Sequence, residues 1–110
     1  MILSGRRVLV LQGEYLIALD LQEVLEKEGA VVTIGSQYDQ NDDFDCILID
    51  NNAAQRNADQ LTSAGIPLVV YTGDVVIARR LFPNAVIIGK PALDKALITA
   101  VVTAIKRLAV

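Results

Sequence analysis

The sequence predicts an α/β protein built on an open, doubly wound, five-stranded parallel sheet. Short apolar runs alternate with segments of helical periodicity, and continuous apolar runs are typical of parallel strands buried on both faces. The expected strands are 7–11, 31–34, 46–49, 68–71 and 85–88, and the expected helices are 14–28, 53–64 and 93–108. Gly29 and Gly65 are expected to end the first two helices.

Length and composition indicate one folded domain spanning residues 1–110. Of the 110 residues, 53% are apolar, which excludes a disordered chain. A chain of this length buries a core without needing disulfides or metals. Its longest apolar runs fall well short of the ~20 residues of a membrane span. The N-terminal segment is too short for a signal peptide, so we expect a cytoplasmic protein.

Charge and residue types exclude several classes of function. Lys and Arg number 10 and Asp and Glu 13, and the resulting net charge of −3 argues against direct binding of nucleic acid. Histidine is absent, which removes Ser-His and Cys-His catalysis, imidazole metal ligands and a phosphohistidine. The single cysteine, Cys46, lies in an apolar run and is expected to be a small buried core residue.

Three polar side chains follow predicted strands. Asp50, Thr72 and Lys90 each come directly after an apolar run, and the carboxyl ends of parallel strands share one edge of the sheet. Alone, an Asp or Thr there is usually a turn or cap residue, and a Lys a solvated charge. Together they offer a nucleophilic carboxylate, a hydroxyl donor and a cation for a phosphoryl oxygen.

These residues stand in stretches that resemble the receiver domains of two-component response regulators. The resemblance covers nearly the whole chain and is closest over residues 6–32, RRVLVLQGEYLIALDLQEVLEKEGAVV. It implies a flavodoxin-like sheet of strand order 2-1-3-4-5. DCILIDNN implies that Asp50 is the phosphoacceptor, and IPLVVYTGD that Thr72 is the switch hydroxyl. VIIGKP implies that Lys90 senses the phosphate, next to a cis peptide bond before Pro91.

The resemblance also implies a Mg²⁺ site, and here the sequence departs from the family. Receiver domains end the first strand in two acidic residues that bind the metal, whereas this chain has Gln12 and Gly13. Glu14 comes one position late and reaches the site only if the loop rearranges. Asp50 and the backbone carbonyl of Asn52 remain, whereas Mg²⁺ prefers an oxygen shell anchored by carboxylates. We therefore expect weak Mg²⁺ binding or none.

Two further departures concern the crossovers and the switch. Only residues 35–45 separate the second and third strands, too few for a full crossover helix with both loops, and the third and fourth crossovers are also short. The aromatic switch position on the fifth strand corresponds to Ile87. The coupling of a threonine to an aromatic ring, which the family uses, is therefore not expected here.

The last predicted helix has an apolar arc of about 180°, wider than the ~100° of a helix packed on one core. Beside an apolar stripe that starts at Leu93 lies a second stripe of Ile98, Val102 and Ile105. The second stripe is either additional core or an interface. The resemblance favours a homodimer interface, because receiver domains dimerise through the fourth helix, fifth strand and fifth helix.

The first predicted helix carries two apolar residues outside its core stripe, Leu16 and Leu19. They are either packed against the sheet or part of a surface that docks the phosphodonor, which is the role of this helix in receiver domains.

Three functions remain open at this point. The first is a degenerate receiver that acts in one constitutive state through protein–protein contact or dimerisation, favoured by Gln12, Gly13 and Ile87. The second is a working switch that a histidine kinase or phosphotransfer protein phosphorylates on Asp50 and a downstream signalling protein reads. The third is a small enzyme with Asp50 as nucleophile, but the sequence offers no general base beside it and no glycine-rich phosphate loop.

Overall fold

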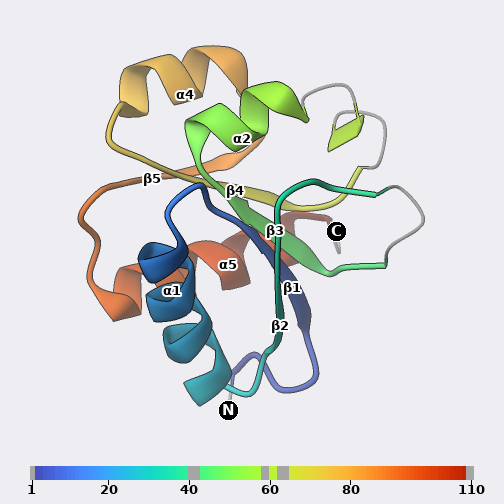
Figure 1. Ribbon diagram of the computed structural model, residues 1–110. Coiled ribbons are helices and arrows are strands. Elements are labelled where there is room, and N and C mark those ends of the chain that lie inside the picture. The colour runs from blue at the N-terminus through green and yellow to red at the C-terminus, as the bar shows by residue number, and fades with distance from the viewer. Residues whose placement is uncertain (1, 40–42, 58–59, 62–64, 109–110) are drawn as a thin grey trace.

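The computed structural model describes residues 2–39, 43–57, 60–61 and 65–108 (Figure 1). Its strands are β1 (Arg7–Leu11), β2 (Val31–Gly35), β3 (Cys46–Ile49), β4 (Leu68–Thr72) and β5 (Val86–Gly89). Its helices are α1 (Tyr15–Lys27), α2 (Asn51–Arg56), α4 (Val75–Leu81) and α5 (Asp94–Leu108). All strand pairs are parallel and the order is β2-β1-β3-β4-β5, so the predicted fold class and strand order are confirmed.

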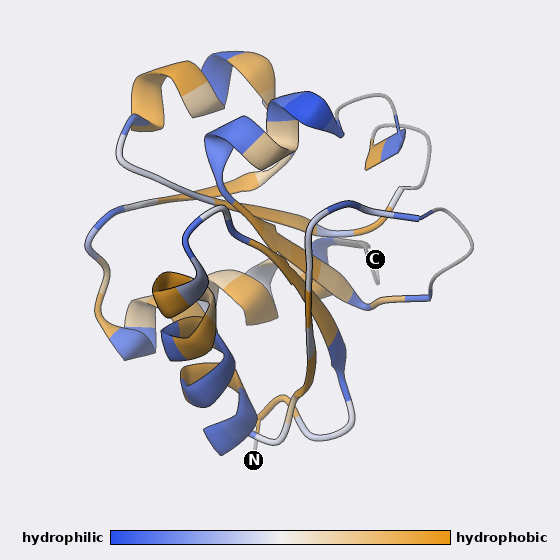
Figure 2. Ribbon diagram, in the orientation of Figure 1, coloured by the Kyte–Doolittle hydropathy of each residue, from blue (hydrophilic) through white to orange (hydrophobic). Residues whose placement is uncertain are grey.

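Both faces of the sheet are covered (Figure 1). On one face, α1 and α5 pack over Val8, Val10 and Leu48. On the other face, α2 and α4 pack over Leu9 and Ile47. Because alternate side chains of β1 and β3 point into two different cores, β3 is apolar throughout and β1 is apolar after Arg7, as Figure 2 shows.

The crossover from β2 to β3 is short, as predicted, and its described residues form no helix. Tyr38 and Phe44 are buried here against the sheet face that also carries α2. The Asn57 side chain holds this segment, since its Oδ1 accepts the N–H of Tyr38 at 3.2 Å. Over the described residues of this crossover, two buried aromatic rings therefore cover the sheet where a helix would otherwise pack.

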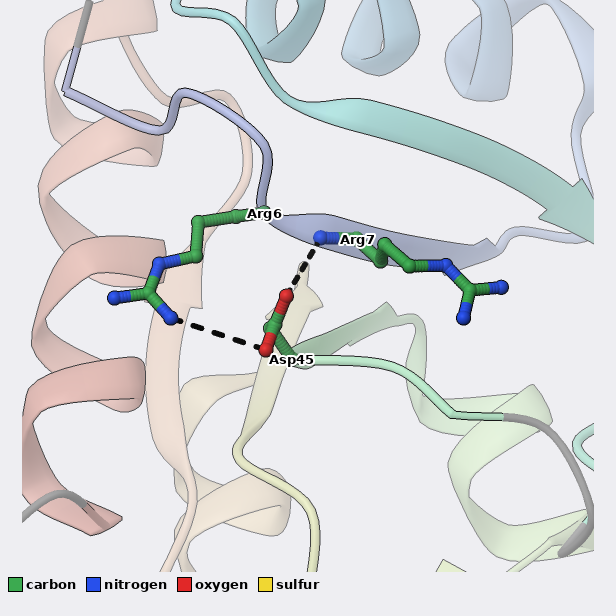
Figure 3. A network of polar contacts seen from close by, with 3 residues as sticks. All are labelled: Arg6, Arg7 and Asp45. Carbon is green, nitrogen blue, oxygen red and sulfur yellow. Dashed lines mark hydrogen bonds and ion pairs between the residues drawn. The ribbon is translucent and has the colours of Figure 1, made fainter.

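The start of β3 is fastened to the start of β1 by Asp45 (Figure 3). One carboxylate oxygen of Asp45 accepts the backbone N–H of Arg7 at 2.8 Å, and the other lies 3.9 Å from the Arg6 guanidinium. The Arg7 guanidinium lies 5.1 Å from the centre of the Phe44 ring. These contacts help to set the pairing of the two central strands at the edge opposite Asp50.

Two helices differ from the prediction. The predicted helices did not include one between the fourth and fifth strands, where α4 forms with Asp74 as its N-cap. The Asp74 carboxylate accepts the N–H of Ile77 at 3.1 Å. α2 begins at Asn51 rather than at residue 53, because Asp50 caps it. It ends at Arg56, and residues 58–59 and 62–64 of the predicted helix lie outside the described residues.

The apolar faces of α1 and α5 are also partly different from expectation. Leu93 precedes α5 and is 81% exposed, so it does not share the burial of Leu97 and Val101 on the same stripe. Ile98, Val102 and Ile105 are half-buried and pack against the core under α5. On α1, Leu16 is 76% exposed, which places it on the surface and not in the core.

Cys46 is fully buried in the core, as predicted. Burial raises the pKa of its thiol from 9.0 to about 12, and the nearby Asp45 charge acts in the same direction. Within the described part of the chain, no helix is both long and apolar enough to cross a membrane.

Candidate functional site

The carboxyl edge of the sheet brings the three predicted site residues onto neighbouring strands. Asp50 directly follows β3, Thr72 ends β4 and Lys90 directly follows β5. Thr72 is buried, whereas Asp50 and Lys90 are half-buried. The backbone carbonyl of Thr72 accepts the N–H of Lys90 at 2.7 Å, which extends the β4–β5 ladder to the site itself.

The Asp50 carboxylate is engaged by two backbone N–H groups. Its Oδ1 accepts the N–H of Ala53 at 2.7 Å, which caps α2. Its Oδ2 accepts the N–H of Gly13 at 2.9 Å, which ties the loop after β1 to the end of β3. Hydrogen bonds to a charged acceptor are about twice as strong as neutral ones, so the carboxylate fastens two loops together.

Thr72 is bonded to the start of α4. Its Oγ1 accepts the N–H of Asp74 at 2.9 Å, and Asp74 in turn caps α4 through Ile77. A hydroxyl that accepts one hydrogen bond still carries its own proton. Thr72 therefore has a donor left for a group at the site, while its oxygen holds the turn into α4.

Lys90 is directed to an aromatic ring. Its Nζ lies 5.3 Å from the centre of the Tyr71 ring, within the range of a cation–π interaction. Among the described residues it makes no ion pair with Asp50. The Tyr71 hydroxyl accepts the N–H of Ala92 at 3.2 Å, and the Lys90–Pro91 peptide is cis, as the resemblance implied.

The sequence matches no protein-family model and no curated relative. Solved structures do match. A CheY-like receiver domain protein from Methanospirillum hungatei aligns with a TM-score of 0.80 at 20% identity, over 96% of this chain and 98% of that one. Full-length FixJ from B. japonicum aligns with a TM-score of 0.81 at 20% identity, over 94% of this chain and 59% of that one.

A third structure is the receiver domain of the sensor histidine kinase PA1611 from Pseudomonas aeruginosa, which has a magnesium ion in its active-site cleft. It aligns with a TM-score of 0.75 at 15% identity, over 94% of this chain and 99% of that one. The chain has the receiver-domain fold. At identities this low, the structural similarity establishes the fold, and the chemistry has to be inferred from the residues at the site.

The residues at the edge of this receiver fold do not fit Mg²⁺. Gln12 presents a neutral amide, whose buried Nε2 has no hydrogen-bond partner among the described residues, and an amide brings no negative charge to anchor Mg²⁺. Gly13 has no side chain, and the exposed Glu14 precedes α1 without capping it. The described residues contain no group of three Asp, Glu, His or Cys side chains placed to hold a metal ion.

The two remaining expected ligands give Mg²⁺ little anchoring. Each oxygen of Asp50 accepts one N–H group and keeps a free lone pair, so Asp50 is one carboxylate without an acidic partner beside it. Asn52 lies in the first turn of α2, where helical geometry directs its carbonyl along the axis and away from the cap. The same turn carries a buried Asn51 Oδ1 that lacks a hydrogen-bond partner among the described residues. The described site therefore offers one carboxylate and a neutral amide oxygen, without the acidic pair that anchors Mg²⁺.

The switch position and two unpredicted residues complete the receiver site. Ile87, where the resemblance expects the switch aromatic, is half-buried and packs on the face that carries α2 and α4. Sequence reasoning missed the roles of Tyr71 and Asp74. Asp74 was detectable as a cap residue just before VVIARRL. Tyr71 was not, because its position near Lys90 depends on the pairing of Tyr71 with Ile88 between β4 and β5.

Proposed function

We propose that this chain is a degenerate receiver, a cytoplasmic, non-enzymatic module of phosphorelay signalling that acts through protein–protein contact in one constitutive state. The observation that carries the proposal is the Asp50 carboxylate, which two backbone N–H groups engage at 2.7 and 2.9 Å beside Gln12 and Gly13. A receiver that lacks the acidic pair, and whose carboxylate fastens two loops, is expected to keep its fold and lose its switch.

The charges at the site support this proposal. Phosphoryl transfer to a carboxylate requires positive charge on the phosphoryl oxygens. The cation placed to provide it is Lys90, and its ammonium faces the Tyr71 ring. A loss of only ~3 kcal/mol of transition-state stabilisation slows a reaction more than a hundredfold. We therefore expect phosphorylation of Asp50 to be very slow or absent.

Exposed apolar side chains on two helices are the surfaces we propose for partners. They are Tyr15, Leu16 and Leu19 on α1 and Val76, Ile77 and Leu81 on α4. Clustered apolar side chains on a surface commonly mark protein interfaces. The partners we propose are a histidine kinase, a phosphotransfer protein or a downstream signalling protein, because receiver domains interact with proteins of these classes.

We also propose a homodimer that includes α5. The stripe of Ile98, Val102 and Ile105 packs in part on the core and leaves part of each side chain accessible. Val102→Glu is expected to give a folded monomer, because an unpaired charge in an interface costs several kcal/mol. The control is Thr99→Glu, at an exposed position of α5. Sedimentation of wild type as a monomer at roughly 100 μM, well above the μM affinities of weak dimers, contradicts the dimer.

The second candidate is a working phosphoacceptor. It is favoured by the presence of Asp50, Thr72 and Lys90 on neighbouring strands at one edge of the sheet. One experiment separates the two. The purified protein is incubated with acetyl phosphate, with and without Mg²⁺, and its mass is measured. A degenerate receiver keeps its mass, whereas a phosphoacceptor gains one phosphoryl group, about 80 Da with ~1.5–2 negative charges, and loses it when Asp50 is changed to Asn.

A further inference from the structure

A cavity of about 550 Å³ lies at the edge of the sheet opposite Asp50. It forms where β4 and β5 begin and where α4 and α5 end. Its walls are largely apolar and include Leu61, Ile66, Phe82 and Val86. Small-molecule sites in proteins are concave, mostly apolar and of roughly 300–1,000 Å³, and this cavity has those properties.

One charged side chain lines this cavity among the described residues, and it is Arg107 in the last turn of α5. Arg107 makes no ion pair with a described residue. Basic side chains near the end of a helix often serve only to offset its dipole. Lys106 is also in the last turn of α5 but does not line the cavity. Both residues can offset the helix dipole, whereas only Arg107 borders the cavity.

We propose that this cavity binds a small amphipathic organic anion, with an apolar ring or short alkyl body and one carboxylate. The apolar walls would cover the body, and burying it contributes about 25 cal/mol per Å². The Arg107 guanidinium would bind the carboxylate, because its planar fork matches a carboxylate with two parallel hydrogen bonds. This inference concerns a site at the far edge of the sheet and does not depend on whether Asp50 is phosphorylated.

The first test uses 8-anilinonaphthalene-1-sulfonate, which joins aromatic rings to one anionic group. It is titrated into the folded protein and followed by fluorescence and by backbone amide NMR shifts. We expect saturable binding, with the largest shifts at Phe82, Val86 and Ala104. The proposal is overturned if the largest shifts occur instead at Tyr15 and Leu16, which are exposed on α1. It is also overturned if no binding is detected at about 1 mM probe, since a dissociation constant of ~1 mM corresponds to a binding free energy of only ~4 kcal/mol.

Paired variants test the anion. Arg107→Gln should weaken binding about tenfold, equivalent to ~1.4 kcal/mol, and Arg107→Lys should recover part of the loss. Lys106→Gln removes the same charge from the neighbouring position and should leave binding unchanged. Equal weakening by the two Gln variants shows that only net charge matters and overturns the site. Both positions are exposed, so all of these variants are expected to fold.

Competition tests the carboxylate. In the wild type, 4-phenylbutyrate should displace the probe at a concentration about tenfold lower than the neutral 4-phenylbutanol does, a difference of ~1.4 kcal/mol. Ala85 also lines the cavity, and Ala85→Leu should reduce binding of both by filling the space. Equal competition by the acid and the alcohol contradicts the proposed anion, and undiminished binding to folded Ala85→Leu contradicts the cavity.

Discussion

The two halves of the site are held in different ways. On β1 and β3, Asp50 connects segments far apart in sequence, since its carboxylate bonds to Gly13 as well as to Ala53. On β4 and β5, Thr72 bonds to Asp74 two residues away, and Lys90 faces the ring of Tyr71 on the adjacent strand. Side chains that share one edge of a sheet thus need not act on one another.

Helix starts explain much of this difference. The first backbone N–H groups of a helix have no partner within it and attract a nearby carboxylate or hydroxyl. Asp50 and Asp74 both stand between a strand and a helix, and both cap the helix that follows. Asp50 differs because the loop after β1 passes beside its second oxygen, and so the cap also becomes a tie between loops.

The largest effect is expected when acidic residues are returned to the Asp50 half. A Cβ at Gly13 lies 3.5 Å from Asp50 Oδ2, an ordinary contact, so a side chain fits there. Gln12→Glu with Gly13→Asp should bind Mg²⁺ and be labelled by acetyl phosphate more than about a hundredfold faster than wild type. Its melting temperature should rise with Mg²⁺ and fall again with EDTA, because the metal relieves carboxylate repulsion.

The control for that variant is Ser4→Asp with Asn84→Asp, which adds the same charge at exposed positions away from the site. Its melting temperature should not respond to Mg²⁺. A wild type that binds Mg²⁺ tightly and is labelled on Asp50 contradicts the degenerate receiver and indicates that Glu14 replaces the missing acid.

Removing the hydrogen bonds of Asp50 should have a smaller effect, measured as a loss in the free energy of unfolding. Asp50→Ala loses the cap and the bond to Gly13, each worth about 1 kcal/mol, so the free energy of unfolding should fall by about 2 kcal/mol. Asp50→Asn keeps one oxygen to accept the N–H of Ala53 and should lose about half as much. Urea unfolding measures both. Two variants within ~0.5 kcal/mol of wild type would show that the carboxylate does not fasten the loops.

Cys46, on the strand that leads to Asp50, makes a pH-dependent contribution to the free energy of unfolding. Its pKa is raised from 9.0 to about 12 in the folded protein, so the folded state holds this proton more tightly. The resulting stability is complete below pH 9 and is lost as pH rises towards 12, by about 1.4 kcal/mol at pH 10. Cys46→Ala lacks the thiol and should lose stability less steeply over that range in urea unfolding at several pH values. Identical slopes would mean that the thiol contributes nothing.

The Thr72 half should show a smaller effect of local origin. Thr72→Val keeps the shape of the side chain but leaves the N–H of Asp74 without its acceptor, and should lower the free energy of unfolding by about 1 kcal/mol. Thr72→Ser retains the hydroxyl and should recover most of that loss. If Ser is as destabilising as Val, the methyl group matters here and the hydrogen bond does not.

The smallest effect concerns Lys90 and Tyr71. A double-mutant cycle of Tyr71→Leu and Lys90→Met should give a coupling free energy of about 0.5 kcal/mol from urea unfolding, the value typical of a cation–π pair near a surface. Tyr71→Phe keeps the ring and loses only the bond to Ala92, so Lys90→Met should cost as much in that background as in wild type. Zero coupling between Tyr71→Leu and Lys90→Met would show that the ammonium is not held by the ring.

Much of this architecture was predictable from local pattern. The five strands agree with the prediction to within one residue at each end, because each is a short apolar run bounded by turn residues. α4 was missed because its seven residues begin with two β-branched valines and show little periodicity. Sequence could not separate the buried Leu97 on α5 from the exposed Leu93 just before it, since both fit one helical stripe.

Local pattern was enough to predict the alternation of strands and helices and the side chains that follow the strands, because apolar periodicity and strand ends are local properties of the chain. What those side chains touch depends on tertiary packing. Asp50 meets Gly13 across 37 positions of sequence, and Lys90 meets Tyr71 through the β4–β5 pairing. Such contacts depend on how separate segments pack and on which rotamers that packing permits, and no local pattern encodes either.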